Sequence, residues 1–133
     1  MKVGDALPEL VKGPITKDDL KRYAAASGDP NPIHLDDEFA RNAGHPGVFA
    51  HGMLSMGYLG EFVVRAAGGN PGAVRKFRAR FAKLTWPGDV ITCKGTVTAV
   101  READGARLVD CDIWTQNQAG EKKVVGTATF ALG

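Results

Sequence analysis

The chain has 133 residues, the length of one domain, and we expect a single domain that spans residues 1–133. Its 17 Lys and Arg residues outnumber its 15 Asp and Glu residues only slightly, so the net charge of +2 is too small for a protein that binds nucleic acids through their phosphates. Hydrophobic residues make up 44% of the chain and charged residues 24%, which is typical of a globular protein and excludes a disordered or collagen-like chain.

No segment predicts a membrane anchor or an export signal. The longest apolar stretch, over 53–64, is interrupted by Glu61 and by glycines and falls short of the roughly 20 residues that span a bilayer. The first residues lack the apolar region of a signal peptide. We therefore expect a cytoplasmic protein without a membrane partner.

The first half of the chain carries the signals of helices. Thr16 predicts a helix start because its hydroxyl can accept hydrogen bonds from free backbone amides, and Gly28 predicts the end of that helix. Prolines force a loop after it, since each proline moves the preceding residue away from helical backbone angles. The predicted elements are, in chain order, a short edge strand over 9–15, a helix over 16–28, a loop over 29–32, a short helix from 36 or 37 to 44, and a long helix over 52–67.

The long helix over 52–67 is expected to lie at the centre of the core. Its apolar side chains point in nearly every direction around the helix axis, a pattern typical of a helix that is buried on all sides. Gly57 and Gly60 each cost a helix interior about 1 kcal/mol relative to alanine. We therefore expect another element to pack closely against these two glycines.

The second half of the chain has the pattern of an antiparallel sheet. Val109, Cys111 and Ile113 alternate with polar residues, so one face of the sheet is expected to be buried. Helices followed by strands indicate the α+β class, with one long helix wrapped by an antiparallel sheet. The predicted strands, rich in Val, Thr, Phe and Trp, lie over 73–83, 89–100, 106–117 and 121–132.

The loop before the short helix holds three side chains that can carry chemistry. Asp29, Asn31 and His34 stand in a segment that two prolines make rigid. A carboxylate and an imidazole together can take up and donate a proton near neutral pH, as the addition or elimination of water requires. In the structural alternative these are turn residues: Asp29 starts an Asx turn, Asn31 bonds to its own backbone, and His34 lies beneath the short helix.

His51 and Gly52 stand where the long helix begins. The first backbone N–H groups of a helix have no partner within it and lie at the positive end of its dipole, so they can bind an oxyanion that develops during a reaction. Gly52 leaves room for a substrate to approach them. In the alternative, His51 is merely a neighbour of the helix cap and Gly52 relieves a steric conflict.

Two motifs in this region belong together. The pattern D-x-N-P-x-H over 29–34, followed by a short helix and by H-G-M over 51–53, resembles the hydratase motif of the MaoC-like family, the (R)-specific enoyl-thioester hydratases and 3-hydroxyacyl-thioester dehydratases. The later P-G-D over 87–89 is similar to that family too, and the resemblance extends from about Val3 to the C-terminus. Around the motifs the chain is also similar to the catalytic subunit of mycobacterial-type fatty-acid-elongation dehydratases.

The resemblance implies a hot-dog fold, in which an antiparallel β-sheet wraps a long central helix. It implies that Asp29 and His34 activate water for attack on Cβ of a trans-2-enoyl thioester and handle the proton at Cα, while the backbone N–H of Gly52 binds the thioester carbonyl. Asn31 is expected to fix the loop, and Asn31 and His51 are assigned to the substrate-binding residues. The reaction requires no cofactor and no metal ion.

One position departs from the family pattern. Some members have a serine on the central helix that bonds the catalytic aspartate, whereas this chain has Gly60 there and Ser55 earlier on the same helix. Asp29 must then be oriented by water or by a backbone amide. The family also places the substrate tunnel between two hot-dog units, so we expect a homodimer or a heterodimer with a paralogue.

A run of basic residues over 75–83 makes the second part of the chain positively charged. Most such runs are solvated strand faces. In the functional interpretation, Arg78 and Arg80 contact the phosphates of coenzyme A or an acidic acyl-carrier protein, either of which can carry the acyl thioester.

Three alternatives to the hydratase interpretation are open at this point. A metal site formed by the histidines with Asp29, Asp36 and Asp37 lacks the usual zinc spacing. A non-catalytic thioester-binding or partner subunit has no need of an intact pair of Asp29 and His34. A hot-dog thioesterase releases a free thiol, which hydration does not.

Overall fold

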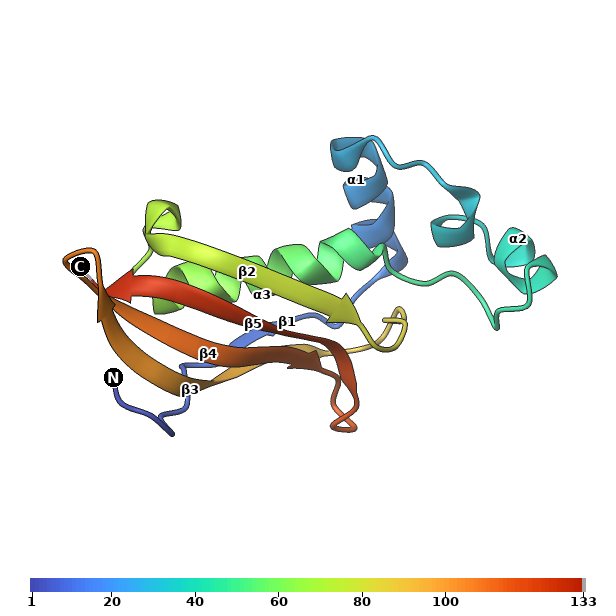
Figure 1. Cartoon of the computed structure of the whole chain (residues 1–133). Helices are drawn as coiled ribbons and strands as arrows, with labels where there is room; N and C mark the ends of the chain where they lie inside the picture. Colours follow the sequence, from blue (N-terminus) through green and yellow to red (C-terminus); the bar gives the residue numbers. More distant parts are fainter. Residues whose placement is uncertain (133) are drawn as a thin grey trace.

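The computed structural model describes residues 1–132, and after a short first strand its helices precede the remaining strands, as predicted (Figure 1). The elements are β1 (Leu10–Lys12), α1 (Lys17–Ser27), the 3-10 turn η1 (Pro32–His34), α2 (Asp37–Asn42), α3 (Gly52–Ala66), the 3-10 turn η2 (Pro71–Ala73), β2 (Val74–Phe81), β3 (Ile91–Ala103), β4 (Ala106–Gln116) and β5 (Lys122–Leu132).

The strands form one antiparallel sheet in the order β1-β3-β4-β5-β2. The helix α3 lies along one face of this sheet and contacts β2, β3, β4 and β5 (Figure 1). On β4 the buried residues are Val109, Cys111, Ile113 and Thr115, and the alternation of the first three with polar residues predicted that face. The arrangement confirms the predicted α+β hot-dog architecture, in which the sheet wraps a central helix.

Both ends of α1 follow the sequence signals. Thr16 Oγ1 accepts a hydrogen bond from the Asp19 N–H at 3.1 Å, and the Asp19 carboxylate accepts one from the Thr16 N–H at 2.9 Å, which completes a capping box. Gly28 ends the helix with a φ of 74°, in the left-handed region that glycine adopts without strain. Within residues 1–132, no helix combines the length and the apolar character that crossing a lipid bilayer requires.

The bounds of two strands differ from the prediction, and β3 extends to Ala103 rather than ending at residue 100. β1 covers only 10–12 of the predicted 9–15. β3 begins at Ile91 rather than at residue 89 because Asp89 closes a turn, in which its carboxylate accepts a hydrogen bond from the Trp86 N–H at 2.9 Å. These differences do not change the order of the elements.

Only one face of α3 is buried, which corrects the expectation of a helix covered on all sides. Ser55, Leu59, Phe62 and Val63 are buried, whereas Met53 is 58% exposed. The sheet covers one side of the helix, and Leu54 and Tyr58 are only partly buried against the core. The helix α3 therefore has more apolar surface than one copy of the chain buries.

The expected close packing at Gly57 and Gly60 is absent. Among residues 1–132, no heavy atom beyond the helix's own backbone lies within 4 Å of the position that a Cβ would take at either glycine. Gly57 is exposed and Gly60 is half-buried. Both glycines therefore border open space in the isolated chain.

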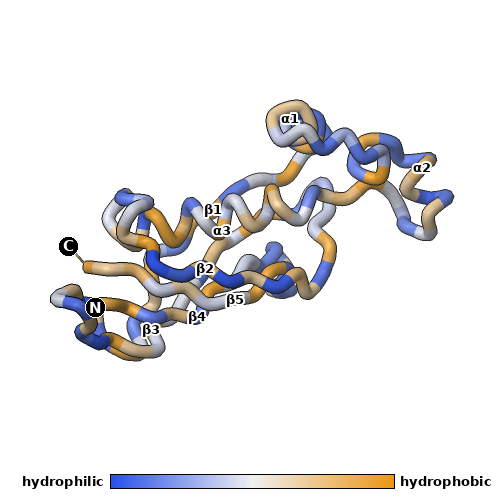
Figure 2. Tube along the Cα trace, turned by 45° about the horizontal axis from the view of Figure 1, so that its top comes forward, coloured by the Kyte–Doolittle hydropathy of each residue, from blue (hydrophilic) through white to orange (hydrophobic). Residues whose placement is uncertain are grey.

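The segment from α1 to α2 extends beyond one end of the sheet in both views (Figures 1 and 2). The main contact of α2 is with η1, in the same segment. At the opposite edge of the sheet from β1 lies β2, which Figure 2 shows as a strongly hydrophilic stretch. Within the segment from α1 to α2, Asp29 and His34 contact His51, the residue that precedes α3.

Candidate active site

The loop over 29–34 is held by hydrogen bonds between side chains and its own backbone. Asn31 Oδ1 accepts a hydrogen bond from the Ile33 N–H at 3.1 Å and so caps η1, which begins with Pro32. Asp29 Oδ1 accepts a hydrogen bond from the Asn31 N–H at 3.3 Å. The turn bonds of the structural alternative are therefore present, and one of them orients the carboxylate of Asp29.

His34 lies half-buried at the end of η1. Its Nδ1 is 2.8 Å from the carbonyl oxygen of Phe49, and because a carbonyl can only accept, Nδ1 carries the proton. In the neutral ring, Nε2 is then the unprotonated nitrogen and can act as a base. Burial lowers the pKa of His34 below its usual value of 6.5, the bond to Phe49 opposes this shift, His51 lowers the pKa further, and Asp29 raises it. Near neutral pH the site therefore offers a neutral imidazole.

The His51 side chain lies between this loop and α3 and is only 2% exposed. Its Nε2 is 3.1 Å from the carbonyl oxygen of Asp29, and its ring is stacked on that of His34 with the ring centroids 4.0 Å apart. One ligand-type atom from each of Asp29, His34 and His51 lies within 4.8 Å of the others. Folding thus gathers the acid and both imidazoles into one cluster.

The other acids of the metal-site alternative have different partners. A carboxylate oxygen of Asp36 accepts hydrogen bonds from two backbone amides and caps α2. Asp37 binds the Lys17 ammonium group, and the ring of His45 lies edge-on against Phe49 with centroids 4.9 Å apart. The metal-site alternative required three further residues to join the cluster. They lie outside it: Asp36, Asp37 and His45.

Gly52 is the first residue of α3 and is exposed. His51 precedes it as the N-cap residue but makes no side-chain hydrogen bond to the helix start, so the first amides remain available to an oxyanion. The ring of Phe81 is 3.1 Å from the position that a Cβ at residue 52 would take. A larger residue at position 52 would have to displace that ring.

A cavity of about 210 Å³ lies beside Gly52. Phe49 connects this cavity to the loop, because it is one of the lining residues and its carbonyl oxygen accepts the hydrogen bond from His34. Ser55 also lines the cavity, and its Oγ donates to Thr85 Oγ1 at 3.4 Å rather than to Asp29. The complete lining is Phe49, Ala50, Gly52, Ser55, Phe81, Lys83, Leu84, Thr85 and Val124.

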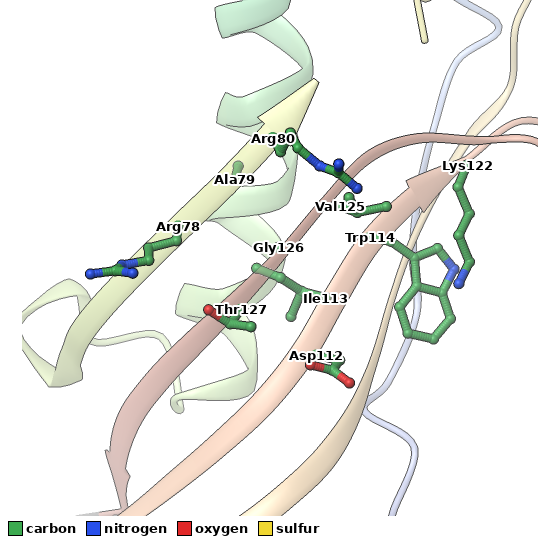
Figure 3. A pocket seen from close by; sticks show the side chains of 10 residues that line it. All are labelled: Arg78, Ala79, Arg80, Asp112, Ile113, Trp114, Lys122, Val125, Gly126 and Thr127. Carbon is green, nitrogen blue, oxygen red and sulfur yellow. The ribbon is translucent and has the colours of Figure 1, made fainter. Parts of the chain in front are cut away.

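Arg78 and Arg80 line a different cavity, of about 470 Å³, on the exposed side of the sheet (Figure 3). Within residues 1–132 neither arginine forms an ion pair. Across the cavity the Lys122 ammonium group lies 4.5 Å from the ring centroid of Trp114. The remaining lining residues are Ala79, Asp112, Ile113, Val125, Gly126 and Thr127. The two arginines thus lie apart from the cluster of Asp29 and His34.

Sequence reasoning missed three residues of these sites. Phe49 acts through its main-chain carbonyl, which leaves no signal in the identity of the residue. Trp114 and Lys122 come to lie near the arginines through the pairing of β4 with β5. The available signal for Trp114 was its position in β4, where it alternates with buried residues and therefore faces away from the core.

Comparison with known proteins agrees with this geometry. The family model described as MaoC like domain matches residues 3–119. The fatty acid synthase beta subunit TOXC of Cochliobolus carbonum is 40% identical over 107 residues, which is 80% of this chain and 5% of that protein. The mitochondrial 3-hydroxyacyl-[acyl-carrier-protein] dehydratase of Arabidopsis thaliana is 34% identical over 110 residues, 82% of this chain and 63% of that protein.

A solved structure extends the agreement to the fold. The (R)-hydratase from A. caviae involved in PHA biosynthesis superposes with a TM-score of 0.84 and 25% identity, over 100% of this chain and 98% of the other. The chain spans less than two thirds of the length of the two curated relatives above. The match over 3–119 confirms the resemblance seen in the two sequence motifs: the chain belongs to the MaoC-like family and has its hot-dog fold.

Proposed function

We propose that this chain adds water reversibly to trans-2-enoyl thioesters and forms (3R)-hydroxyacyl thioesters, which makes it a hydro-lyase of fatty-acid metabolism. The observation that carries the proposal is the position of His34, whose Nδ1 is bonded to the Phe49 carbonyl and whose ring lies in one cluster with Asp29. His51 also belongs to that cluster, and the residue that follows it in the chain is Gly52, whose backbone N–H is available to a ligand. A base, an acid and an oxyanion donor are the groups that hydration of a conjugated thioester needs.

The reaction follows from these positions. Asp29 orients a water molecule, His34 Nε2 takes one of its protons, and the water oxygen forms a bond to Cβ. The electron pair of the double bond moves toward the carbonyl, and the Gly52 N–H donates to the oxygen as it becomes enolate-like. The pair of Asp29 and His34 then returns the proton to Cα, so that one water molecule is added and no electrons are exchanged with a cofactor. Dehydration is the reverse sequence.

Asn31 supports this chemistry from within the loop. Its amide N–H donates to the Asp29 carboxylate, and its side chain caps η1, which carries His34. These bonds favour a role in orienting both residues. They also provide an orienting group for Asp29 in a chain that has Gly60 in place of the family's serine.

The cavity beside Gly52 is the proposed location of the acyl chain. A thioester carbonyl that bonds the Gly52 amide has its acyl carbons within reach of this cavity, whose walls include Phe81 and Leu84. The volume of about 210 Å³ favours an acyl chain of limited length.

The cavity with Arg78 and Arg80 is the proposed contact for the anionic end of the thioester carrier. Two guanidinium groups and Lys122 offer charge and forked hydrogen bonds to phosphates, and the half-buried ring of Trp114 offers a stacking surface. Phosphates of coenzyme A and the acidic surface of an acyl-carrier protein share this chemistry.

The active unit is proposed to be a dimer, formed with a second copy or with a paralogue. β2 is an eight-residue strand at the edge of the sheet, and within residues 1–132 no strand pairs with its outer side. Met53, Phe81 and Leu84 expose 58%, 52% and 39% of their surface around Gly52. The accessible surface of 7225 Å² also exceeds the roughly 6,700 Å² expected for a monomer of this size. Light scattering on the purified protein measures the mass of the unit.

The experiment that tests the proposed function is the incubation of purified protein with crotonyl-coenzyme A. Hydration removes the absorbance of the conjugated enoyl thioester without release of thiol, which a colorimetric thiol reagent monitors in the same sample. Release of thiol would instead identify a thioesterase. Binding of the substrate without any turnover would identify a non-catalytic thioester-binding subunit.

A further inference from the structure

The surroundings of His51 do not fit the substrate contact that the motif suggested. The side chain is 98% buried, and Tyr23 and His34 lie against its ring, with centroids at 4.8 Å and 4.0 Å. It also makes no hydrogen bond to the helix that it precedes. A substrate that reaches Gly52 therefore does not reach the imidazole of the residue before it.

The hydrogen bond of His51 points instead to the loop. Its Nε2 lies 3.1 Å from the carbonyl oxygen of Asp29, a residue 22 positions earlier in the chain. Because the carbonyl can only accept, Nε2 carries the proton, and Nδ1 is left buried without a hydrogen-bond partner. A buried polar atom without a hydrogen-bond partner costs free energy. The structure therefore accepts this cost at Nδ1 while it keeps the hydrogen bond at Nε2.

The two rings form a second link. His34 is held at Nδ1 by the carbonyl of Phe49, and its ring plane is tilted by only 28° from that of His51. His51 itself is fixed at the N-cap of α3. One side chain therefore connects the main chain of Asp29, the ring of His34 and the start of the helix at Gly52.

We propose that His51 is a positioning residue, which holds the Asp29 main chain and the His34 ring in register with the Gly52 amide through its Nε2–H bond to the Asp29 carbonyl. The inference rests on the proposed hydratase function, since it assigns a role in the same site. Without the bond, the loop over 29–34 keeps its own turn bonds and the ring contact of His34, but it loses its hydrogen bond to the N-cap residue of α3. A displacement of reacting groups by about 1 Å can lower a rate by about 100-fold.

Two substitutions separate the hydrogen bond from the ring. His51→Phe keeps an aromatic ring for Tyr23 and His34 and removes the donor, whereas His51→Gln places an amide donor near the position of Nε2 and removes the ring. We expect the Phe variant to lose about 10- to 100-fold in kcat with KM within about threefold of wild type. We expect the Gln variant to recover most of that loss. His45→Phe is the matched control, because His45 also packs against an aromatic ring but has no contact with Asp29, and it keeps the wild-type kcat.

The outcome that overturns the inference is a folded Phe variant with kcat within about twofold of wild type, or a Gln variant as slow as the Phe variant. A measurement on the unmodified protein removes the dependence on folding of the variants. Nuclear magnetic resonance of protein with ¹⁵N-labelled histidine reports the tautomer of each ring, and the structure assigns the Nε2–H form to His51. An Nδ1–H form at His51 would contradict the inference. If wild-type protein has no hydratase activity, the proposed function fails, whereas active wild type with unaffected His51 variants refutes only the positioning role.

Discussion

The main-chain carbonyl of Phe49 accepts a hydrogen bond from His34 Nδ1 at 2.8 Å and thereby determines which nitrogen of that histidine carries the proton. The proton on Nδ1 leaves the lone pair on Nε2, so the ring acts as a base without first losing a proton. The same Phe49 residue lines the cavity beside Gly52. A single residue between two elements thus connects the base to the proposed acyl pocket.

The pH dependence follows from the buried position of His34. Burial lowers its pKa below 6.5, so the neutral and active form persists to a lower pH than in an exposed histidine. We predict that kcat/KM for hydration is constant in the neutral range and decreases as the pH is lowered, with a midpoint below 6.5. Asp29 raises this pKa, so the residual activity of Asp29→Asn has its midpoint at a still lower pH. A midpoint above 6.5 in the wild-type profile would contradict the assignment of His34 as the base.

The cavity beside Gly52 makes a prediction about chain length. Phe81 lies at the cavity wall and against the position of a Cβ at residue 52, so Phe81→Ala enlarges the space next to the reacting carbonyl. Each methylene that becomes buried contributes about 0.8 kcal/mol, or roughly a fourfold increase in kcat/KM. We predict that the variant shifts the preference from short toward longer enoyl thioesters by about this factor for each added methylene.

Phe39→Ala is the control for this prediction, because Phe39 is a similarly exposed phenylalanine on α2 that does not line the cavity. Competition between enoyl thioesters of graded length measures the preference in both variants. An unchanged preference in Phe81→Ala would place the acyl chain elsewhere.

The arginine cavity is tested by charge reversal. We predict that Arg78→Glu combined with Arg80→Glu raises KM for crotonyl-coenzyme A by about 2- to 30-fold, since each of two exposed charge pairs contributes about 0.2–1 kcal/mol. The effect decreases at high salt, which screens exposed charges. A crotonyl thioester of N-acetylcysteamine, which has no phosphates, keeps its KM. Arg107→Glu, on β4 and outside this cavity, is the control. Equal KM values for coenzyme A substrate in wild type and the double variant would refute the assignment.

A buried lysine supports the wall of the proposed acyl cavity. Lys123 is 3% exposed, donates to the Leu84 carbonyl at 2.9 Å and lies 3.6 Å from the Asp89 carboxylate. Removal of one partner from a buried ion pair leaves the other charge uncompensated and costs about 3–5 kcal/mol. We predict that Lys123→Met lowers the free energy of unfolding by about this amount in urea titrations.

Lys83→Met is the matched control for the buried pair. Lys83 is 57% exposed and pairs with Glu121 at 3.2 Å, and such exposed pairs contribute about 0–1 kcal/mol. Equal losses of stability in the two variants would show that the Lys123 pair has no special role in the fold.

The order of the elements was predictable because local signals determine it. Thr16 and Gly28 mark the ends of α1 by their own hydrogen-bonding and backbone preferences, without help from distant residues. The burial of α3 was not predictable in the same way. Its apolar residues, Met53 among them, outnumber the positions that the chain's own sheet covers, and no local signal distinguishes a side that another surface covers from one that the core covers.

The candidate site likewise contains residues that the sequence pattern indicates and residues that only the fold brings together. Residue types at fixed spacing singled out Asp29, Asn31, His34 and Gly52 as candidates, because the proposed chemistry needs those side chains or, at Gly52, the absence of one. The acceptor for His34 was not found, since every residue has a carbonyl group. The partners of the Arg78 cavity were not found either, because they depend on which strands pair and in what register.

The most direct measurement of the central claim is kcat for hydration of crotonyl-coenzyme A by wild type and by Asp29→Asn. Positioned acid–base groups contribute about 10²- to 10⁴-fold to a rate, and we predict a loss of kcat in this range. Asp18→Asn is the control, because Asp18 is an exposed carboxylate of α1 that pairs only with Arg22 and has no part in the loop. A rate for Asp29→Asn within a few-fold of wild type would contradict the account.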